Sequence, residues 1–406
     1  MKGANRKPRI ASEVFVVGRQ MDVDGLRSMA QRDPAQFAAR TQDLIDSGEL
    51  RWSKVRDVKG LFHKLDGISV PAAVSVAGET RAIQASAFPL LAGGMTIAGI
   101  QEAYESVPAI GGELVTETED NKRVSIYAGI TSEDVNIDRV DEGKDFPEIG
   151  AGEEKYEIRS NRNGRRLSIT AEMIEENDMP AIVERVNALG EIAAETVESQ
   201  TLRRVTDHTG SAASGAEPYV LHLNGAGTAL YNATAANPGA RAASGTRVTN
   251  NALVDETDLE AARAKLVAMR NSRGERIFVP MSRCILLVPD ALAGTAAKLT
   301  LSEYQPGVEN ELNAWGPRGM YRPRVLSSPK LDDLSTSAWY LGDFQRQFKR
   351  KWKLRFEYVT LSTDTESFLR SRLAFQARVA WDVEVGAVDY VYVVQSLSAT
   401  TAPADE

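Results

Sequence analysis

Apolar side chains recur at helical spacing between residues 178 and 207. They are separated by four, three, four and four positions: Ile182, Val186, Leu189, Ala193 and Val197. This spacing places them on one face of an α-helix, and Asp178 followed by Pro180 is typical of a helix start. The pattern predicts a helix of about 28 residues, roughly 40 Å long at 1.5 Å per residue. It is the largest element that the sequence predicts.

Shorter helices are predicted at 33–48, 53–65, 171–176 and 255–274. Between the second and the long helix, the composition from Gly67 to Gly94 shifts to Ala, Val, Ser, Pro and Gly without a reliable period. We interpret that segment as an extended arm. Residues 209–250 are rich in Gly, Ala, Ser, Thr and Asn, which indicates loops or an insertion.

Strand patterns occur on both sides of the long helix. Residues 155–170 alternate apolar and polar positions around Asn163-Gly164, a dipeptide that tight hairpin turns prefer, and therefore predict a β-hairpin. The apolar run RCILLVP at 283–289 predicts a short buried strand. Alternating Tyr390, Tyr392 and Val394 predict a closing strand.

A basic and aromatic stripe, RQFKRKWKLRFEYV, occupies residues 346–359. As a strand, it directs aromatic and apolar side chains to one face: Phe348, Trp352, Leu354, Phe356 and Tyr358. The other face carries Lys349, Lys351, Lys353, Arg355 and Glu357, and only Arg350 breaks the alternation. Single-strand nucleic-acid binders place both kinds of side chain on one exposed surface. We therefore expect a buried aromatic face, and a basic face that contacts either another subunit or nucleic acid.

Composition limits the classes of protein that the sequence fits. A chain of 406 residues allows two or three domains, and a net charge of −8 argues against a protein that mainly grips phosphates. Residues 133–154 alone hold nine acidic and two basic side chains, which is either a solvated acidic loop or a charged contact surface. No apolar segment is long enough for a membrane span. The lone Cys284 is expected to be buried, which suits a reducing cytoplasm.

No constellation of chemical groups points to catalysis. His63, His208 and His222 lie in unrelated contexts, and one cysteine cannot complete a zinc set. The sequence contains no nucleophile elbow, P-loop or zinc-protease motif. We accordingly predict no catalytic, cofactor-binding or metal-binding residues.

The order of these segments resembles the major capsid proteins of tailed bacteriophages, whose HK97-like capsid fold is shared with encapsulins. The resemblance covers about residues 80–397. It is carried by YEIRSNRNGRRLSITAEMIEEND before the long helix, by LEAARAKL with FVPMSRCILLVPDAL, and by the stretch from WKLRFEYV to DYVYVVQ. None of these stretches is a catalytic motif.

The resemblance implies an α+β fold with six parts. These are an N-terminal helical extension (1–66), an N-arm and the start of the peripheral domain (67–123), an extended hairpin called the E-loop (124–160), the peripheral domain with its spine helix (161–208), an axial domain with a Gly/Ala-rich insertion (209–345), and a return to the peripheral domain with a C-terminal tail (346–406).

The function implied is structural. Copies of the chain would form hexamers and pentamers and close into an icosahedral head around double-stranded DNA, held without sequence specificity. Portal, scaffold or maturation-protease partners are expected, with no cofactor and no membrane. The protein would be assembled in the host cytoplasm and reside in the virion. The alternatives are an encapsulin-like nanocompartment shell, or an enzyme with its active site in the axial-like α/β unit.

The resemblance also suggests where subunits touch, because the E-loop of such proteins lies over an adjacent subunit. We expect the acidic hairpin segment and the basic strand face to meet between subunits. The candidate residues are Asp141, Glu142, Lys144 and Asp145 in the hairpin, and Lys349, Lys351, Lys353 and Arg355 in the strand. The alternative is that the basic strand faces the packaged DNA.

Overall fold

The computed structural model describes residues 87–132, 151–170, 178–207, 220–223, 226–231, 245–270, 275–306, 311–362 and 373–398, with single positions between 36 and 47 and between 172 and 176. The chain divides into two compact units. Unit 1 comprises Met1–Pro108, Arg162–Thr196 and Phe356–Trp381, and unit 2 comprises Ala109–Asn161, Val197–Arg355 and Asp382–Glu406.

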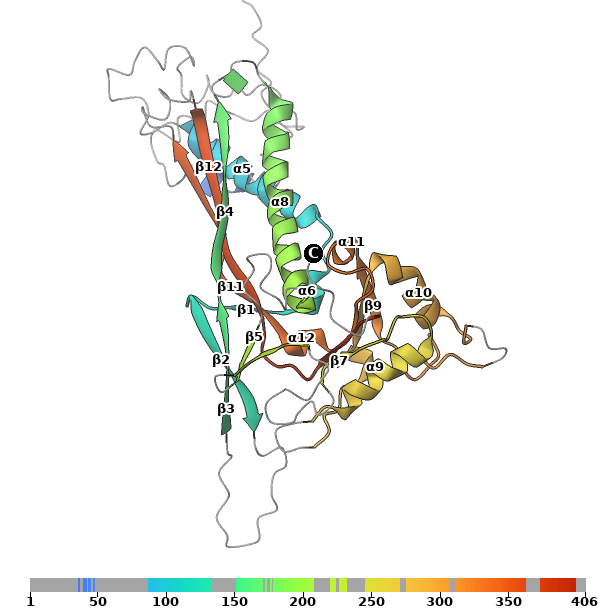
Figure 1. Ribbon diagram of the computed structural model, residues 1–406. Coiled ribbons are helices and arrows are strands. Elements are labelled where there is room, and N and C mark those ends of the chain that lie inside the picture. The colour runs from blue at the N-terminus through green and yellow to red at the C-terminus, as the bar shows by residue number, and fades with distance from the viewer. Residues whose placement is uncertain are drawn as a thin grey trace, which may run out of the picture. The chain divides into compact units, whose positions relative to one another are not determined.

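Unit 1 consists of two packed helices and strands of a mixed sheet. Its elements are α5 (Ala87–Ser106), most of α8 (Met179–Thr206), β4 (Asn161–Thr170), and parts of β11 (Phe348–Ser362) and β12 (Leu373–Ala387). The strand order of the four-stranded sheet is β1-β11-β12-β4 (Figure 1). The mixture of helices and sheets agrees with the α+β class expected from the sequence.

Helix α8 confirms the long helix predicted at 178–207. It spans 28 residues, and the five apolar side chains that predicted it are between 0 and 7% exposed. In unit 1, α8 packs closely against α5, because a Cβ atom built on Gly190 would lie 2.5 Å from the Ile100 carbonyl oxygen and 2.7 Å from the Ala103 Cβ. The small residue lets the two helix backbones approach.

The extended arm predicted up to Gly94 is wrong in its last part, because residues 87–106 form α5. Pro89 lies within the first turn, where a missing amide leaves no intrahelical bond unmade. Met95, Ala98 and Ile100 are at most 2% exposed. Burial of these side chains outweighs the low helix propensity of the glycines. Residues 67–86, and the helix predicted at 53–65, lie outside the described part of the chain.

The hairpin predicted at 155–170 is also wrong. Asn163 and Gly164 lie inside the continuous strand β4, and β3 (Ala151–Arg159) pairs instead with β2 (Val124–Ser132), from Val124 opposite Arg159 to Ser132 opposite Ala151. A Cβ atom on Gly164 would lie 2.7 Å from the Val379 carbonyl oxygen of β12. The glycine allows the backbones of β4 and β12 to approach each other closely, and it does not form a turn.

Unit 2 contains a five-stranded sheet with the order β7-β13-β10-β8-β9. Its strands are β7 (Arg247–Val248), β8 (Ile285–Pro289), β9 (Arg324–Ser328), β10 (Trp339–Gly342) and β13 (Val393–Ser396). The helices are α6 (Gly111–Leu114), α9 (Glu256–Ala268), α10 (Asp290–Leu301), α11 (Pro329–Asp332), α12 (Phe344–Gln347) and the 3₁₀ turn η3 (Met281–Arg283). Two hairpins complete it: β2–β3, and β5 (Val220–Leu223) with β6 (Ala226–Ala229).

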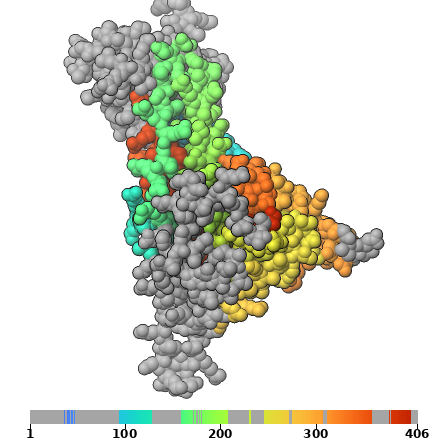
Figure 2. Space-filling view, viewed as in Figure 1, coloured from blue at the N-terminus to red at the C-terminus, as the bar shows by residue number. Residues whose placement is uncertain are grey.

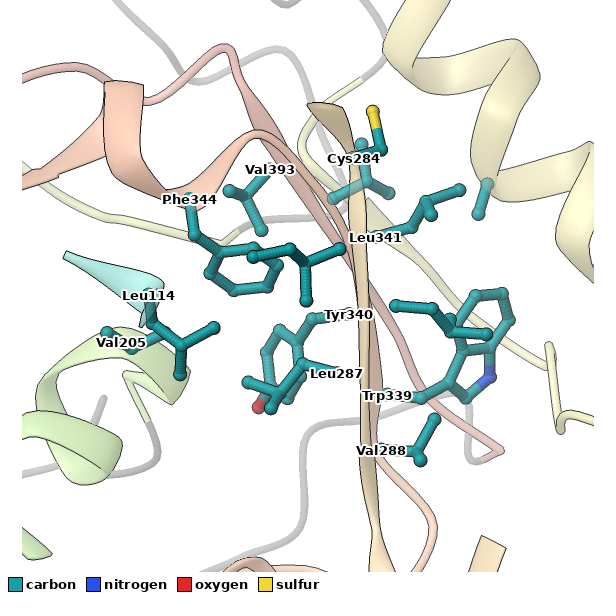
Figure 3. Close-up of a cluster of buried hydrophobic side chains, with 14 of the residues drawn as sticks. Leu114, Val205, Cys284, Leu287, Val288, Trp339, Tyr340, Leu341, Phe344 and Val393 are labelled. Atoms are coloured by element: carbon teal, nitrogen blue, oxygen red, sulfur yellow. The ribbon is translucent and has the colours of Figure 1, made fainter. Parts of the chain in front are cut away.

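The core of unit 2 surrounds the central strand β10 and its neighbour β8, in which every residue is buried. Leu287, Tyr340 and Phe344 lie together in this cluster (Figure 3). Cys284 is buried and unpaired, as predicted, and burial, aided by the nearby Asp343 charge, raises the pKa of its thiol to about 12. The thiol is therefore a structural and not a reactive group.

Helix α9 shows how local sequence sets a helix start. The Asp255 side chain accepts from the Thr257 backbone N–H, and Asp258 accepts in turn from the Asp255 backbone N–H at 3.0 Å, which together form a capping box. The helix ends at Ala268, six residues before the predicted end at Gly274, because Met269 adopts an extended backbone conformation.

Candidate functional site

Strand β11 contains most of the basic and aromatic stripe of residues 346–359, and β1 (Thr116–Glu119) runs parallel to it. The register pairs Thr116 with Lys349 and Glu119 with Trp352. The predicted strand is confirmed from Phe348, whereas Arg346 belongs to α12. The aromatic face is buried as predicted at its first two positions, since Phe348 is 0% and Trp352 3% exposed.

The predicted exposed basic face is wrong at Lys351, which is fully buried. Its Nζ donates to the Lys122 carbonyl oxygen at 2.5 Å. Burial lowers the pKa of the ammonium group, and the nearby Asp120 carboxylate opposes that effect. The alternation fails here because the turn that follows β1 covers this position and supplies an acceptor for the amine.

Arg350 forms the buried centre of the site. Its side chain is 9% exposed, and its guanidinium group pairs with Glu117 of β1 and contacts the Thr201 hydroxyl of α8 at 3.5 Å. Burial raises the pKa of the Glu117 carboxyl group, but the hydrogen bond from Arg350 and the charges of Arg350 and Arg355 outweigh it, so that the pKa is lowered overall. The pair holds β1, β11 and α8 together within unit 2.

The remaining basic side chains also find partners on their own chain. Arg355 donates from Nε to Glu119 at 2.5 Å and from a terminal nitrogen to Glu117 at 3.0 Å. The bond with Glu119 raises the pKa of the Arg355 guanidinium. Lys353 lies 3.9 Å from an Asp382 carboxylate oxygen, and the Lys349 ammonium lies 4.9 Å from the centre of the Tyr127 ring.

The structure thus brings the four basic candidates together on β11, but with partners from the same chain: carboxylates, an aromatic ring and, for Lys351, a backbone carbonyl oxygen. Asp141, Glu142, Lys144 and Asp145 lie outside the described residues. Sequence reasoning missed Glu117 and Glu119, although the alternation in TETE places both carboxylates on one face of a strand. Their opposite charge to the basic stripe was the available signal.

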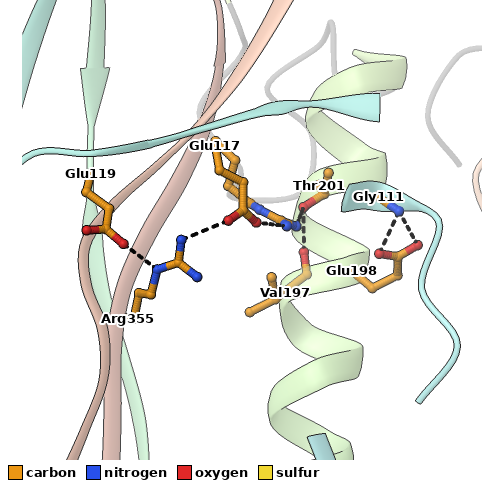
Figure 4. Close-up of polar contacts among 8 residues, drawn as sticks. Gly111, Glu117, Glu119, Val197, Glu198, Thr201 and Arg355 are labelled. Atoms are coloured by element: carbon orange, nitrogen blue, oxygen red, sulfur yellow. Dashed lines mark hydrogen bonds and ion pairs between the residues drawn. The ribbon is translucent and has the colours of Figure 1, made fainter. Parts of the chain in front are cut away.

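Glu198 of α8 is a buried carboxylate that sequence reasoning also missed. It is 4% exposed and accepts from the backbone N–H of Ile110 at 2.9 Å and of Gly111 at 3.0 Å (Figure 4). These are unpaired donors at the start of the short helix α6, which has no side-chain cap of its own. A Cβ atom on Gly111 would lie 2.6 Å from the carboxylate, so glycine lets the acceptor approach.

Replacing Glu198 with alanine should destabilise unit 2 by about 2–3 kcal/mol, because two buried N–H groups lose a charged acceptor. Glu198→Gln, which retains one carbonyl oxygen as acceptor, is the matched control and should cost less. Chemical denaturation of the full-length chain, followed by tryptophan fluorescence, measures both. Equal losses in the two variants would show that the carboxylate does not act as the cap.

The charged groups of this site form ion pairs with one another, cap the start of α6 and connect neighbouring strands and helices. In the described part of the chain, no group of three or more His, Cys, Asp or Glu side chains is placed to hold a metal ion. None of the helices described has the length and apolar composition needed to cross a membrane.

A family model described as phage capsid protein matches residues 153–396. The chain is similar to the virus-like particle from Pyrococcus furiosus, with 7% identity, a TM-score of 0.43, and coverage of 74% of this chain and 97% of that chain. The bacteriophage PhiM1 mature capsid has 11% identity and a TM-score of 0.45, with coverage of 73% and 89%. The cyanophage Pam1 capsid has 10% identity and a TM-score of 0.43, with coverage of 71% and 90%. Curated protein sequences give no match.

Proposed function

The chain belongs to the phage capsid protein family, and from this premise we propose that its copies form hexamers and pentamers and close into a head around double-stranded DNA. The family model covers 153–396, a range that includes α8, the five-stranded sheet and the basic strand. Its role is that of a major capsid protein in a virion shell. We propose that this role involves no turnover of a substrate.

The observation that best supports assembly is the number of large apolar side chains left exposed in unit 2. Val254, Leu301 and Met320 are 69%, 70% and 84% exposed, and Phe278 is 82% exposed. Contact with another copy would remove these side chains from water, which is favourable by the hydrophobic effect. Contacts between copies joined head to tail close into rings, and rings into a shell.

Sedimentation of the purified full-length chain tests the assembly proposal. We expect a boundary from particles of hundreds of copies, with smaller rings as precursors. A single species of one to a few copies, unchanged on raising the protein concentration, would contradict it.

We further propose that DNA is held by confinement and loose charge contacts, without sequence readout. The net charge of −8 and the pairing of the β11 cations on their own chain support this, because few cations of that strand remain for phosphates. Portal, scaffold and maturation-protease partners, and assembly in the host cytoplasm, belong to the same proposal.

Contact between subunits through the acidic hairpin segment remains part of the proposal, but its partner surface needs revision. Of the four basic candidates, Arg355 alone is exposed, because Lys351 is buried and Lys349 and Lys353 are half-buried. Arg165 and Arg166 of β4 are exposed, and the described residues show no ion pair for either, so they are the revised candidates. Strand β4 reaches the surface of unit 1 in the view of Figure 2.

Reversing Arg165 and Arg166 to glutamate should therefore weaken the assembly of empty shells. Opposite charges on adjacent copies steer association and set its register, although each exposed ion pair contributes only about 0–1 kcal/mol to the free energy of association. Adding Asp141→Lys and Glu142→Lys should restore assembly in part. The control, with the same change in net charge, reverses the exposed Arg276 and Lys298.

Light scattering during assembly gives the readout. If the β4 variant forms normal empty shells but its filled particles contain less DNA, these arginines contact the nucleic acid and not another subunit. Equal defects in the β4 variant and its control would show an effect of net charge alone.

A further inference from the structure

Asp207 follows the last residue of α8 and is enclosed by unit 2. It is 6% exposed, and its backbone has a positive φ of 45°, a conformation that Asp and Asn tolerate better than most residues. The backbone N–H groups of Leu230 and Tyr231 donate to its carboxylate. Within the described part of the chain, the other carboxylate oxygen, Oδ1, has no hydrogen-bond partner.

Polar side chains from three other segments hold the end of α8 at the same place. The Tyr231 hydroxyl donates to the Val205 carbonyl oxygen at 2.9 Å, and the Tyr340 hydroxyl of β10 donates to that of Thr206 at 3.0 Å. Gln395 of β13 donates to the Tyr340 hydroxyl at 3.0 Å. Tyr340 and Val205 appear in the same buried cluster in Figure 3. The Thr206 carbonyl group is thus anchored to the five-stranded sheet, and that of Val205 to the residues that follow β6.

A negative charge is poorly accommodated at this position. The C-terminal end of a helix carries partial negative charge on its unpaired carbonyl groups, which repels a carboxylate. Burial adds a desolvation cost, and together these effects favour the protonated form. Burial raises the pKa of Asp207 to about 7, although the charges of Arg247 and Arg204 and the two backbone N–H groups lower it.

The charged and titratable groups around Asp207 are mostly committed to other partners. Arg247 of β7 donates from Nε to the Gln395 side-chain oxygen at 2.6 Å, and Arg204 of α8 pairs with Glu384 of β12 at 3.1 Å. The Lys265 ammonium of α9 donates to the Arg247 carbonyl oxygen at 2.5 Å. The phenols of Tyr231 and Tyr340 complete the surroundings. Of the two arginines, Arg247 has the larger effect on the Asp207 pKa, and its Nε is already bonded to Gln395.

We propose that Asp207 is a proton-linked latch, which holds the C-terminal end of α8 on the sheet of unit 2 when protonated and loosens it when ionised. The native state binds the proton more tightly than an opened state, in which the carboxyl group is hydrated and has an ordinary pKa near 3.9. The extra stability is therefore complete at low pH, and it is lost as the pH rises to and through about 7. The latch lies within one chain and does not rest on shell formation.

Hydrogen exchange of the full-length chain at pH 6 and pH 8 tests the latch, with intrinsic exchange rates divided out. The amides of Leu230 and Tyr231 donate to the carboxylate and are the reporters. Their protection should fall about tenfold from pH 6 to pH 8, as linkage requires for a group with a pKa near 7. The buried Leu287 of β8 is the reference amide and should change less.

Asp207→Asn should abolish this pH dependence, because the amide keeps the shape and the left-handed conformation but cannot ionise. Asp333→Asn, at an exposed aspartate, should retain it. His208 is next in the sequence, and histidine is the residue type that commonly ionises near neutral pH, so His208→Gln must also retain the pH dependence. An unchanged pH dependence in Asp207→Asn, or its loss in His208→Gln, would overturn the proposal.

Arg247→Gln supplies an independent test of the latch if Asp207→Asn does not fold. Removing the nearest counter-charge should move the midpoint of the transition to higher pH, measured by the infrared band of the protonated carboxyl group. A midpoint that stays in place would also count against the latch.

Discussion

Replacing Gly190 with alanine should destabilise unit 1 by about 3 kcal/mol or more. The new methyl group would lie 2.5 Å from the Ile100 carbonyl oxygen and 2.7 Å from the Ala103 Cβ. Both are fixed parts of α5, so the two helices must separate, and overpacking of this kind typically costs about 1–3 kcal/mol when only side chains yield. Separation of the backbones adds lost contacts along the whole α5–α8 interface.

Gly294→Ala makes the same chemical change in helix α10, where no atom lies within 4 Å of the added methyl group. This control should stabilise the chain by up to about 1 kcal/mol, because alanine has the higher helix propensity. The two variants therefore differ in sign. Thermal unfolding of both variants at one protein concentration measures the two changes in stability. A neutral or stabilising Gly190→Ala would show that α5 and α8 do not pack through this glycine.

Replacing Arg350 with methionine should cost about 2–3 kcal/mol, which is more than the same change at Arg355. Methionine retains much of the packing of the Arg350 stem but removes the bonds of the buried guanidinium group to Glu117 and to the Thr201 hydroxyl. Glu117 keeps Arg355 as a partner, so the loss is that of charge-assisted hydrogen bonds and not that of an unpaired charge. Arg355 is 55% exposed, and an exposed pair contributes at most about 1 kcal/mol.

A double-mutant cycle with Glu117→Gln separates the pair from other effects of losing Arg350. If the ion pair causes the loss, the double variant should be more stable than the sum of the single losses predicts. Denaturation midpoints of the four proteins give the coupling. Additive losses, or equal losses for Arg350→Met and Arg355→Met, would contradict the assignment of Arg350 as the centre of the site.

The elements that could be predicted from the sequence are those whose signal is local. Helix α8 follows from the spacing of its apolar side chains, and β8 from an uninterrupted apolar run. In contrast, α5 owes its conformation to burial against α8, because its glycines and Pro89 lower its intrinsic propensity. Gly164 was interpreted as a turn residue, but its role is to allow β12 to approach, which no local pattern records.

The charged site shows the same limit. Alternation along β11 correctly placed Phe348 and Trp352 in the core, but it could not show that the turn after β1 would bury Lys351. The partners Glu117 and Glu119 are more than 200 positions away from Arg350 and Arg355 in the sequence. Pairing over such a separation depends on the parallel register of β1 and β11, which only the folded chain reveals.

The central claim is that copies of this chain close into a shell, and electron microscopy of the purified full-length protein tests it most directly. We predict closed particles with icosahedral symmetry, built from rings of five and six copies. Particles that enclose a protein cargo and no nucleic acid would favour a nanocompartment over a phage head. A field of small soluble oligomers, with no closed particle under any assembly condition, would contradict the claim.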